Sequence, residues 1–159
     1  MAYIEKTIVA GEHIFKEKGF SARYGKKNIP RGPNWNECTE VQRRRNELLK
    51  KKRIVWAICA NFKKTDWWIT LTYRRCERPD SMSVAKKHRS RFIRRLRDKL
   101  KKKDIPLTYT AMTERGVKGG LHHHFIIKNV FDIGIIISLW EHGKVHIENI
   151  YTCLLYTSD

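Results

Sequence analysis

The chain has 159 residues, of which 34 are lysine or arginine and 16 are aspartate or glutamate, so its formal net charge is +18. This length supports one domain, and a hydrophobic content of 41% is enough for a core, which excludes a disordered basic tail. The positive field attracts polyanions, nucleic acid first, and we expect no membrane partner because no lipidation signal, lipid-seeking helix or membrane-length apolar run is found.

The N-terminal part, residues 1–38, is expected to form short strands or a hairpin followed by a loop. Residues 2–24 alternate weakly between apolar and polar side chains and are broken by glycines. Residues 28–37 contain two prolines and a glycine, which is typical of a loop.

A first helix is predicted over about residues 40–60. Thr39 and Gln42 form a capping-box pattern, and apolar residues recur every seven positions from Val41 to Phe62. The other faces of this helix are strongly basic. We expect contacts with nucleic-acid phosphates here from Arg43, Arg44 and Lys51.

A β-branched and aromatic strand over residues 67–73 leads to a second, more basic helix. Ser81 or Ser83 is its expected N-cap, and apolar residues recur every four positions after it. Asp98 is the only acidic residue in the stretch 81–103, so internal salt bridges do not explain the charge. Phosphate binding is favoured, and the expected contacts are Lys87, Arg91, Arg94 and Arg95.

Two more strands over residues 107–114 and 121–128, a short apolar helix over 133–142 and a last strand over 144–150 complete the pattern. The order strand, helix, hairpin, helix, strand predicts an α+β fold, an antiparallel sheet of about five strands with helices packed mainly on one face. We expect one domain over residues 39–152, headed by the first basic helix.

The hairpin in this pattern carries the residues that indicate chemistry. In an extended segment alternate side chains share a face, so His122 and His124 point one way while His123 points the other way. Glu114 on the preceding strand reaches the first face across a glycine-rich turn, which also carries Lys118, another expected DNA contact. Two imidazoles and one carboxylate make an open site for a divalent ion, although histidines in strands more often do structural work.

Several segments stand in an order that resembles a known family. Residues 67–73 match its first motif, and residues 121–125 match its His-hydrophobic-His motif, with His123 at the hydrophobic position. Glu114 matches its third metal ligand, and residues 139–145 resemble the helix and strand that follow the metal site. The chain thus resembles HUH-type replication initiators, the rolling-circle Rep proteins of single-stranded DNA phages and plasmids, and is similar to filamentous-phage replication proteins.

The resemblance implies metal-dependent nicking and joining of single-stranded DNA, which starts rolling-circle replication. Mn²⁺ or Mg²⁺ held by Glu114, His122 and His124 would orient the scissile phosphate for attack by a tyrosine, leaving a 5′-phosphotyrosine and a free 3′-hydroxyl. The implied partners are single-stranded DNA or an origin hairpin and the host replication machinery, without a small-molecule cofactor. The implied location is a bacterial cytoplasm, which suits four cysteines without a CxxC pair.

The family carries its tyrosine on a helix after the last strand, whereas only residues 151–159 follow that strand here. Residues 153–159 are a word-for-word translation of a transposon-end adapter used in preparing sequencing libraries. Our hypothesis is therefore a C-terminally truncated chain that lacks its nucleophile and ends in a non-native tail. If the tail is native, Tyr151 and Tyr156 are the candidate nucleophiles.

Two other functions stay open. A non-catalytic basic DNA- or RNA-binding module, in which the histidines only pack, fits the charge equally well. An HUH transposase or plasmid relaxase shares the ligand set. Among the tryptophans, Trp56 is assigned to the core, and Trp68 is left open between core packing and stacking on unpaired bases.

Overall fold

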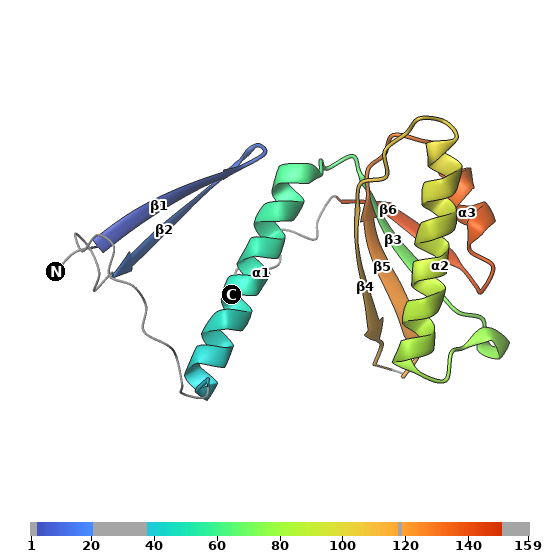
Figure 1. The fold of residues 1–159 in the computed structure, drawn as a ribbon, viewed down its shortest axis with the longest axis horizontal. Coiled ribbons are helices and arrows are strands. Elements are labelled where there is room, and N and C mark those ends of the chain that lie inside the picture. Colours follow the sequence, from blue (N-terminus) through green and yellow to red (C-terminus); the bar gives the residue numbers. More distant parts are fainter. Residues whose placement is uncertain (1–2, 21–37, 118, 151–159) are drawn as a thin grey trace. The chain divides into compact units, whose positions relative to one another are not determined.

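The computed structural model describes residues 3–20, 38–117 and 119–150 (Figure 1). The chain divides into two compact units, residues 1–61 and 62–159. Lys118, Tyr151, Tyr156, the expected loop over 28–37 and the expected tail over 153–159 lie outside the described residues. Within the described ranges, none of the helices is both long and apolar enough to cross a membrane.

The first unit is a hairpin packed against a helix. Strands β1 (Tyr3–Ala10) and β2 (His13–Phe20) pair antiparallel, which confirms a hairpin near the N-terminus, and helix α1 spans Glu40–Asn61. The ring centroids of Phe15 on β2 and Trp56 on α1 are 6.3 Å apart. Lys52 on α1 donates to Glu17 Oε1 on β2 at 2.7 Å. Trp56 therefore packs between elements, as expected.

Helix α1 begins with the capping box that the sequence predicts. The backbone N–H of Gln42 donates to Thr39 Oγ1 at 3.3 Å, and the N–H of Thr39 donates to Gln42 Oε1 at 3.0 Å. The helix nevertheless groups with the hairpin in unit 1–61, and not with the sheet as the expected domain over 39–152 required. The reason is that helical periodicity identifies an apolar face without identifying the element that covers it.

The second unit contains a sheet of four antiparallel strands in the order β4-β5-β3-β6 (Figure 1). Its strands are β3 (Trp67–Thr72), β4 (Tyr109–Arg115), β5 (Leu121–Ile127) and β6 (Val145–Asn149). The helical elements of this unit are η1 (Arg75–Glu77), α2 (Met82–Lys101) and α3 (Gly134–Leu139). The α+β class is confirmed. The sheet of this unit has four described strands, because the N-terminal hairpin forms a sheet of its own.

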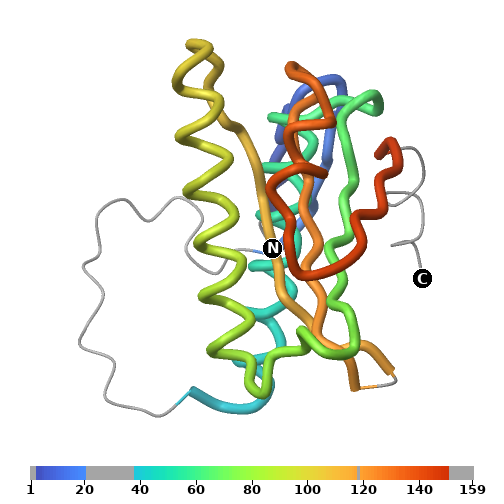
Figure 2. The backbone as a smooth tube through the Cα atoms, turned by 90° about the vertical axis from the view of Figure 1, so that its right-hand side faces the viewer, coloured from blue at the N-terminus to red at the C-terminus, as the bar shows by residue number. Residues whose placement is uncertain are grey.

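Alternate residues of the strands face opposite sides of this sheet. One side, the helix-side face, packs against α2, and the ring centroids of Phe125 on β5 and Phe92 on α2 are 5.5 Å apart. Figure 2 shows α2 as a separate layer beside the strands. The core between them consists of large apolar side chains, among them Ile69, Leu71, Leu96, Leu100 and Ile127.

The other side of the sheet, the open face, is covered by no helix of the described part of residues 62–159. Strand pairing sets the side chains of this face in rows across the sheet. One row runs Glu114, His122 and Thr72, and the next runs Met112, His124, Thr70 and His146. The open face therefore carries the polar residues of all four strands.

Candidate metal centre

The hairpin between β4 and β5 brings the expected ligands together. Its turn is closed by the N–H of Gly116 donating to the carbonyl of Gly120 at 2.8 Å, and by the N–H of Gly119 donating to the carbonyl of Gly116 at 2.8 Å. Gly119 has φ 78, in the left-handed region that glycine adopts without strain. The turn fixes the register in which Glu114 pairs directly with His122.

Three side chains converge on one point of the open face. Oε1 of Glu114 lies 2.8 Å from Nε2 of His122 and 2.9 Å from Nε2 of His124. The three residues each offer one ligand atom, and these atoms lie within 4.8 Å of one another. The predicted pairing of His122 and His124 on one face, with Glu114 beside them, is the geometry that the structure has.

The far nitrogen of each imidazole has its own partner. Nδ1 of His122 lies 3.4 Å from the carbonyl oxygen of Gly120, which only accepts, so this nitrogen carries the proton. Nδ1 of His124 lies 3.0 Å from Thr70 Oγ1, which also accepts a proton from an imidazole. With Nδ1 protonated, each Nε2 presents a lone pair toward the carboxylate. Such partners on the outer nitrogen orient metal-binding histidines in general.

The charge balance of the cluster calls for a cation. The lone pairs of two Nε2 atoms and of a carboxylate oxygen repel one another at these distances unless a proton or a metal ion lies among them. Hydrogen bonds from His122 first, and then from His124, hold the pKa of Glu114 below its ordinary value of 4.5. The carboxylate is thus ionised at neutral pH, and the donor set of two imidazoles and one carboxylate fits a divalent ion.

The cluster is open on one side. The exposed fraction of the Glu114 side chain is 42%, while His122 and His124 are 20% and 16% exposed. Protein ligands that occupy one side of an ion leave coordination positions for water or a phosphate oxygen. The site therefore has the form of a reactive metal centre, since a structural centre would be closed by protein ligands.

His123 lies on the helix-side face, as the alternation predicts. Its side chain is fully buried, the Tyr73 hydroxyl donates to its Nε2 at 2.7 Å, and its Nδ1 donates to Thr113 Oγ1 at 2.9 Å. Nη1 of Arg89 on α2 donates to the same Thr113 oxygen at 2.9 Å. Burial, and then the nearby charge of Arg89, lowers the pKa of His123 to about 4, so the ring is neutral.

Sequence reasoning did not find these partners of His123. Tyr73 and Thr113 lie 50 and 10 residues away from it in the chain, and neither belongs to a spacing that signals a bond. A polar residue amid apolar neighbours in a strand was the only signal, because buried polar groups are almost always hydrogen-bonded.

Trp68 lies on the open face beside the cluster. Its ring centroid is 5.2 Å from that of His124, and the two rings are tilted by 31°. Its side chain is half-buried, and strand pairing places it in the row next to Thr70 and His124. An aromatic side chain therefore borders the candidate metal centre.

The expected DNA contacts are not gathered at the cluster. Lys87, Arg91 and Arg94 are exposed on α2, which lies on the other side of the sheet. Arg95 donates to Glu141 Oε1 at 2.7 Å. The remaining described contacts, Arg43, Arg44 and Lys51, are exposed on α1 in the first unit.

The family model of the replication-associated protein ORF2 matches the chain over residues 66–159. The matched residues are more than half of the 159 and include the four-stranded sheet, α2 and the Glu114, His122, His124 cluster. No curated protein and no solved structure matches the chain. The chain belongs to the replication-associated protein ORF2 family.

Proposed function

We propose that the chain is an HUH-type endonuclease that nicks and rejoins single-stranded DNA to start rolling-circle replication. The observation that carries the proposal is the convergence of Glu114 Oε1 and two histidine Nε2 atoms on one open point. Membership of a family of replication-associated proteins supports a role at DNA, and the net charge of +18 supports a polyanionic substrate.

Glu114, His122 and His124 would hold Mn²⁺ or Mg²⁺. The bound ion would supply charge withdrawal from a scissile phosphate and an orientation for in-line displacement. The protein's own part is to keep the donors in place, because Thr70 and Gly120 hold the two rings through Nδ1. Imidazole nitrogens in the set favour Mn²⁺ over Mg²⁺, which prefers oxygen donors.

Trp68 would position the substrate strand. Aromatic side chains stack on unpaired bases with about 1–3 kcal/mol per base, and they do so without regard to sequence. The ring borders His124 on the open face, so a base stacked on it would bring a neighbouring phosphate toward the cluster. This reading assigns Trp68 to substrate binding.

The chemical step would be a transesterification. A tyrosine oxygen attacks phosphorus and forms a phosphate ester, the bond from phosphorus to the 3′ oxygen breaks, and that oxygen takes up a proton as a free 3′-hydroxyl. The reverse attack by a 3′-hydroxyl rejoins the strand and frees the tyrosine. Tyr151 and Tyr156 are the candidates to test by substitution with phenylalanine, with a covalent protein–DNA adduct in denaturing gels as the readout.

Titration of Mn²⁺ tests the metal site before any cleavage assay. The wild type should bind one ion, detected as loss of the free-ion signal in electron paramagnetic resonance, and a His122→Ala/His124→Ala variant should not. His146→Ala is a matched control, because His146 is an exposed histidine of the open face in the same row as His124. Equal binding by all three proteins would overturn the proposal and favour a basic nucleic-acid-binding module whose histidines only pack.

A further inference from the structure

We propose that the outward face of α2 is a second nucleic-acid surface, which holds the phosphate backbone of a double-stranded segment. It lies on the opposite side of the sheet from the metal centre. The surface needs no metal chemistry, so the inference goes beyond the proposed endonuclease activity and stands without it.

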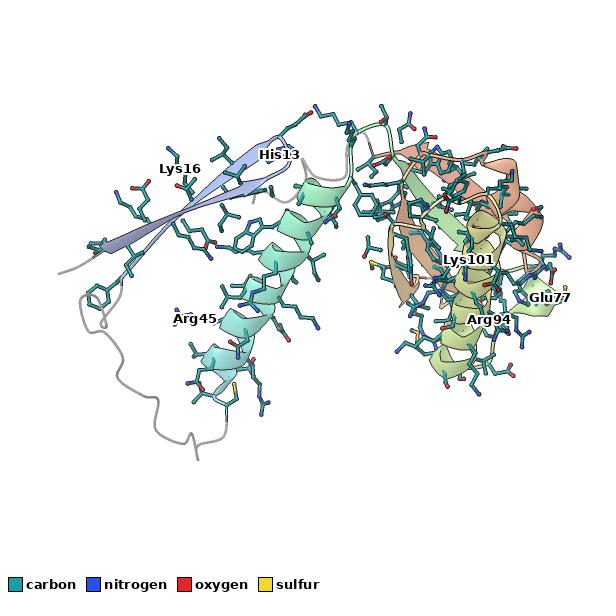
Figure 3. All side chains as sticks on the ribbon, turned by 45° about the horizontal axis from the view of Figure 1, so that its top comes forward. His13, Lys16, Arg45, Glu77, Arg94 and Lys101 are labelled. Carbon is teal, nitrogen blue, oxygen red and sulfur yellow. The ribbon has the colours of Figure 1, made fainter. Side chains whose placement is uncertain are left out.

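The surface is a continuous stripe along one side of the helix. Its members recur at the spacings of three and four residues that bring side chains onto a single helical face. They line a hollow of ≈ 580 Å³ and comprise Ser83, Lys86, Lys87, Ser90, Arg91 and Arg94, which we call the α2 stripe. All six side chains are exposed. Figure 3 labels Arg94 within the stripe and Lys101 beyond it on the same helix.

The cations of the α2 stripe are not neutralised by the protein. Within the described residues, none of Lys86, Lys87, Arg91 and Arg94 forms an ion pair. The neighbouring Arg95 differs, since it is half-buried and pairs with Glu141 at 2.7 Å. Four adjacent unpaired cations produce a strong local field, which is expensive for a folded domain unless an anion is bound there.

The stripe and the metal centre cannot serve one straight strand of substrate. The opposite side of α2 carries Phe92, Leu96 and Leu100, which pack on the helix-side face of the sheet. The Glu114, His122, His124 cluster lies on the open face of the same sheet. A helix layer and the sheet thus separate the two surfaces, and a segment on the stripe is a different part of the nucleic acid from the one at the metal.

The chemistry of the stripe fits a duplex backbone better than a single strand. Its members are lysine, arginine and serine, the side chains that bind phosphate oxygens and fix position without reading bases. Surfaces for single strands add aromatic platforms for stacking, and here the aromatic Trp68 lies on the open face.

The length of the stripe suits several phosphates in a row. Eleven residue steps at ~1.5 Å per residue give a length of roughly 17 Å. A strand of duplex DNA carries one charge per ~3.4 Å of axis, so about five phosphates of one strand lie within that length. Four cations spread along it can each meet a separate phosphate.

The test measures how DNA affinity depends on salt, in the presence of a chelator so that the metal centre plays no part. Lys87→Ala/Arg91→Ala/Arg94→Ala removes three charges from the stripe, and Lys101→Ala/Lys102→Ala/Lys103→Ala removes three exposed charges at the end of the same helix. Each lost phosphate contact reduces the slope of log K against log salt by ~0.9 for duplex DNA. We expect the stripe variant to lose about 2 to 3 units of slope on a labelled duplex, and the control to stay near the wild type.

Two outcomes would overturn the inference. Equal losses in both triple variants would mean that net charge alone sets the affinity, and a larger loss on the matching single strand than on the duplex would exclude a duplex surface. A charge-keeping variant, Lys87→Arg/Arg91→Lys/Arg94→Lys, should retain the wild-type slope and controls for misfolding of the alanine variant. Mn²⁺ binding by the stripe variant should be unchanged, which separates failure here from failure of the proposed metal site.

Discussion

Thr70 Oγ1 lies 3.0 Å from Nδ1 of His124, so a residue of β3 orients a candidate metal ligand that β5 carries. The two residues are directly paired across the strands. Their contact makes the metal centre depend on the register of two strands that are separated in the chain by α2 and β4. Threonine on the open face of β3 thus has a role beyond its preference for strands.

Thr70→Val should weaken metal binding while leaving the fold intact. Valine keeps the shape of threonine but removes the oxygen that holds the His124 ring, and loss of such a partner typically lowers metal affinity by about 10–100-fold. The measurement is the dissociation constant for Mn²⁺. Thr110→Val is the control, because Thr110 also lies on the open face but pairs with Ile126. Unchanged affinity in Thr70→Val would show that this hydrogen bond does not orient the ring.

Tyr73→Phe should have the reverse profile, a loss of stability with metal binding retained. The Tyr73 hydroxyl donates to Nε2 of the fully buried His123 at 2.7 Å, and burial raises the pKa of Tyr73 to about 12, so it remains a donor. Leaving a buried acceptor without its partner costs about 1–3 kcal/mol. Urea unfolding and Mn²⁺ titration of the same variant check both parts. A loss of metal affinity without a loss of stability would mean that the helix-side network acts mainly on the site.

Acid should destabilise the protein through His123. Its pKa is about 4 in the folded chain against an ordinary 6.5, so between these values the unfolded chain binds a proton here and the folded chain does not. The free energy of unfolding therefore falls as the pH is lowered through this window, by about 3 kcal/mol for this group. Below about pH 4 both states carry the proton and the contribution is gone.

His123→Gln isolates that contribution, since glutamine can hydrogen-bond to Tyr73 and Thr113 but does not titrate. Urea unfolding at a series of pH values should show a shallower acid dependence for this variant than for the wild type. His146→Gln, an exposed histidine changed in the same way, should follow the wild type. Parallel curves for all three proteins would contradict a neutral His123 in the fold.

The sequence predicted those parts of the molecule that depend on local pattern. Alternation in β5 correctly separates His123 from its neighbours, the capping box of Thr39 and Gln42 forms, and Ser81 caps α2 by accepting from the N–H of Val84 at 3.3 Å. The carboxylate partner followed because a short hairpin fixes which residues face each other.

The parts that the sequence did not predict depend on contacts between distant segments. Nothing in the periodicity of α1 shows that Phe15 and Glu17 of the hairpin contact it, so its grouping with the hairpin had to be observed. The bond from Thr70 to His124 likewise spans 54 residues. Residue-level pattern gives the face of an element, and tertiary packing gives its partner.

The most direct test of the account is the set of ligands around bound Mn²⁺. Pulsed electron paramagnetic resonance of the wild-type complex should show nitrogen couplings from two imidazoles, and Glu114→Gln should weaken binding by removing the anionic ligand. His122→Ala and His124→Ala should each leave the coupling of one imidazole at most. Mn²⁺ that binds to the wild type without any imidazole nitrogen coupling would contradict the assignment of Glu114, His122 and His124 as the metal centre.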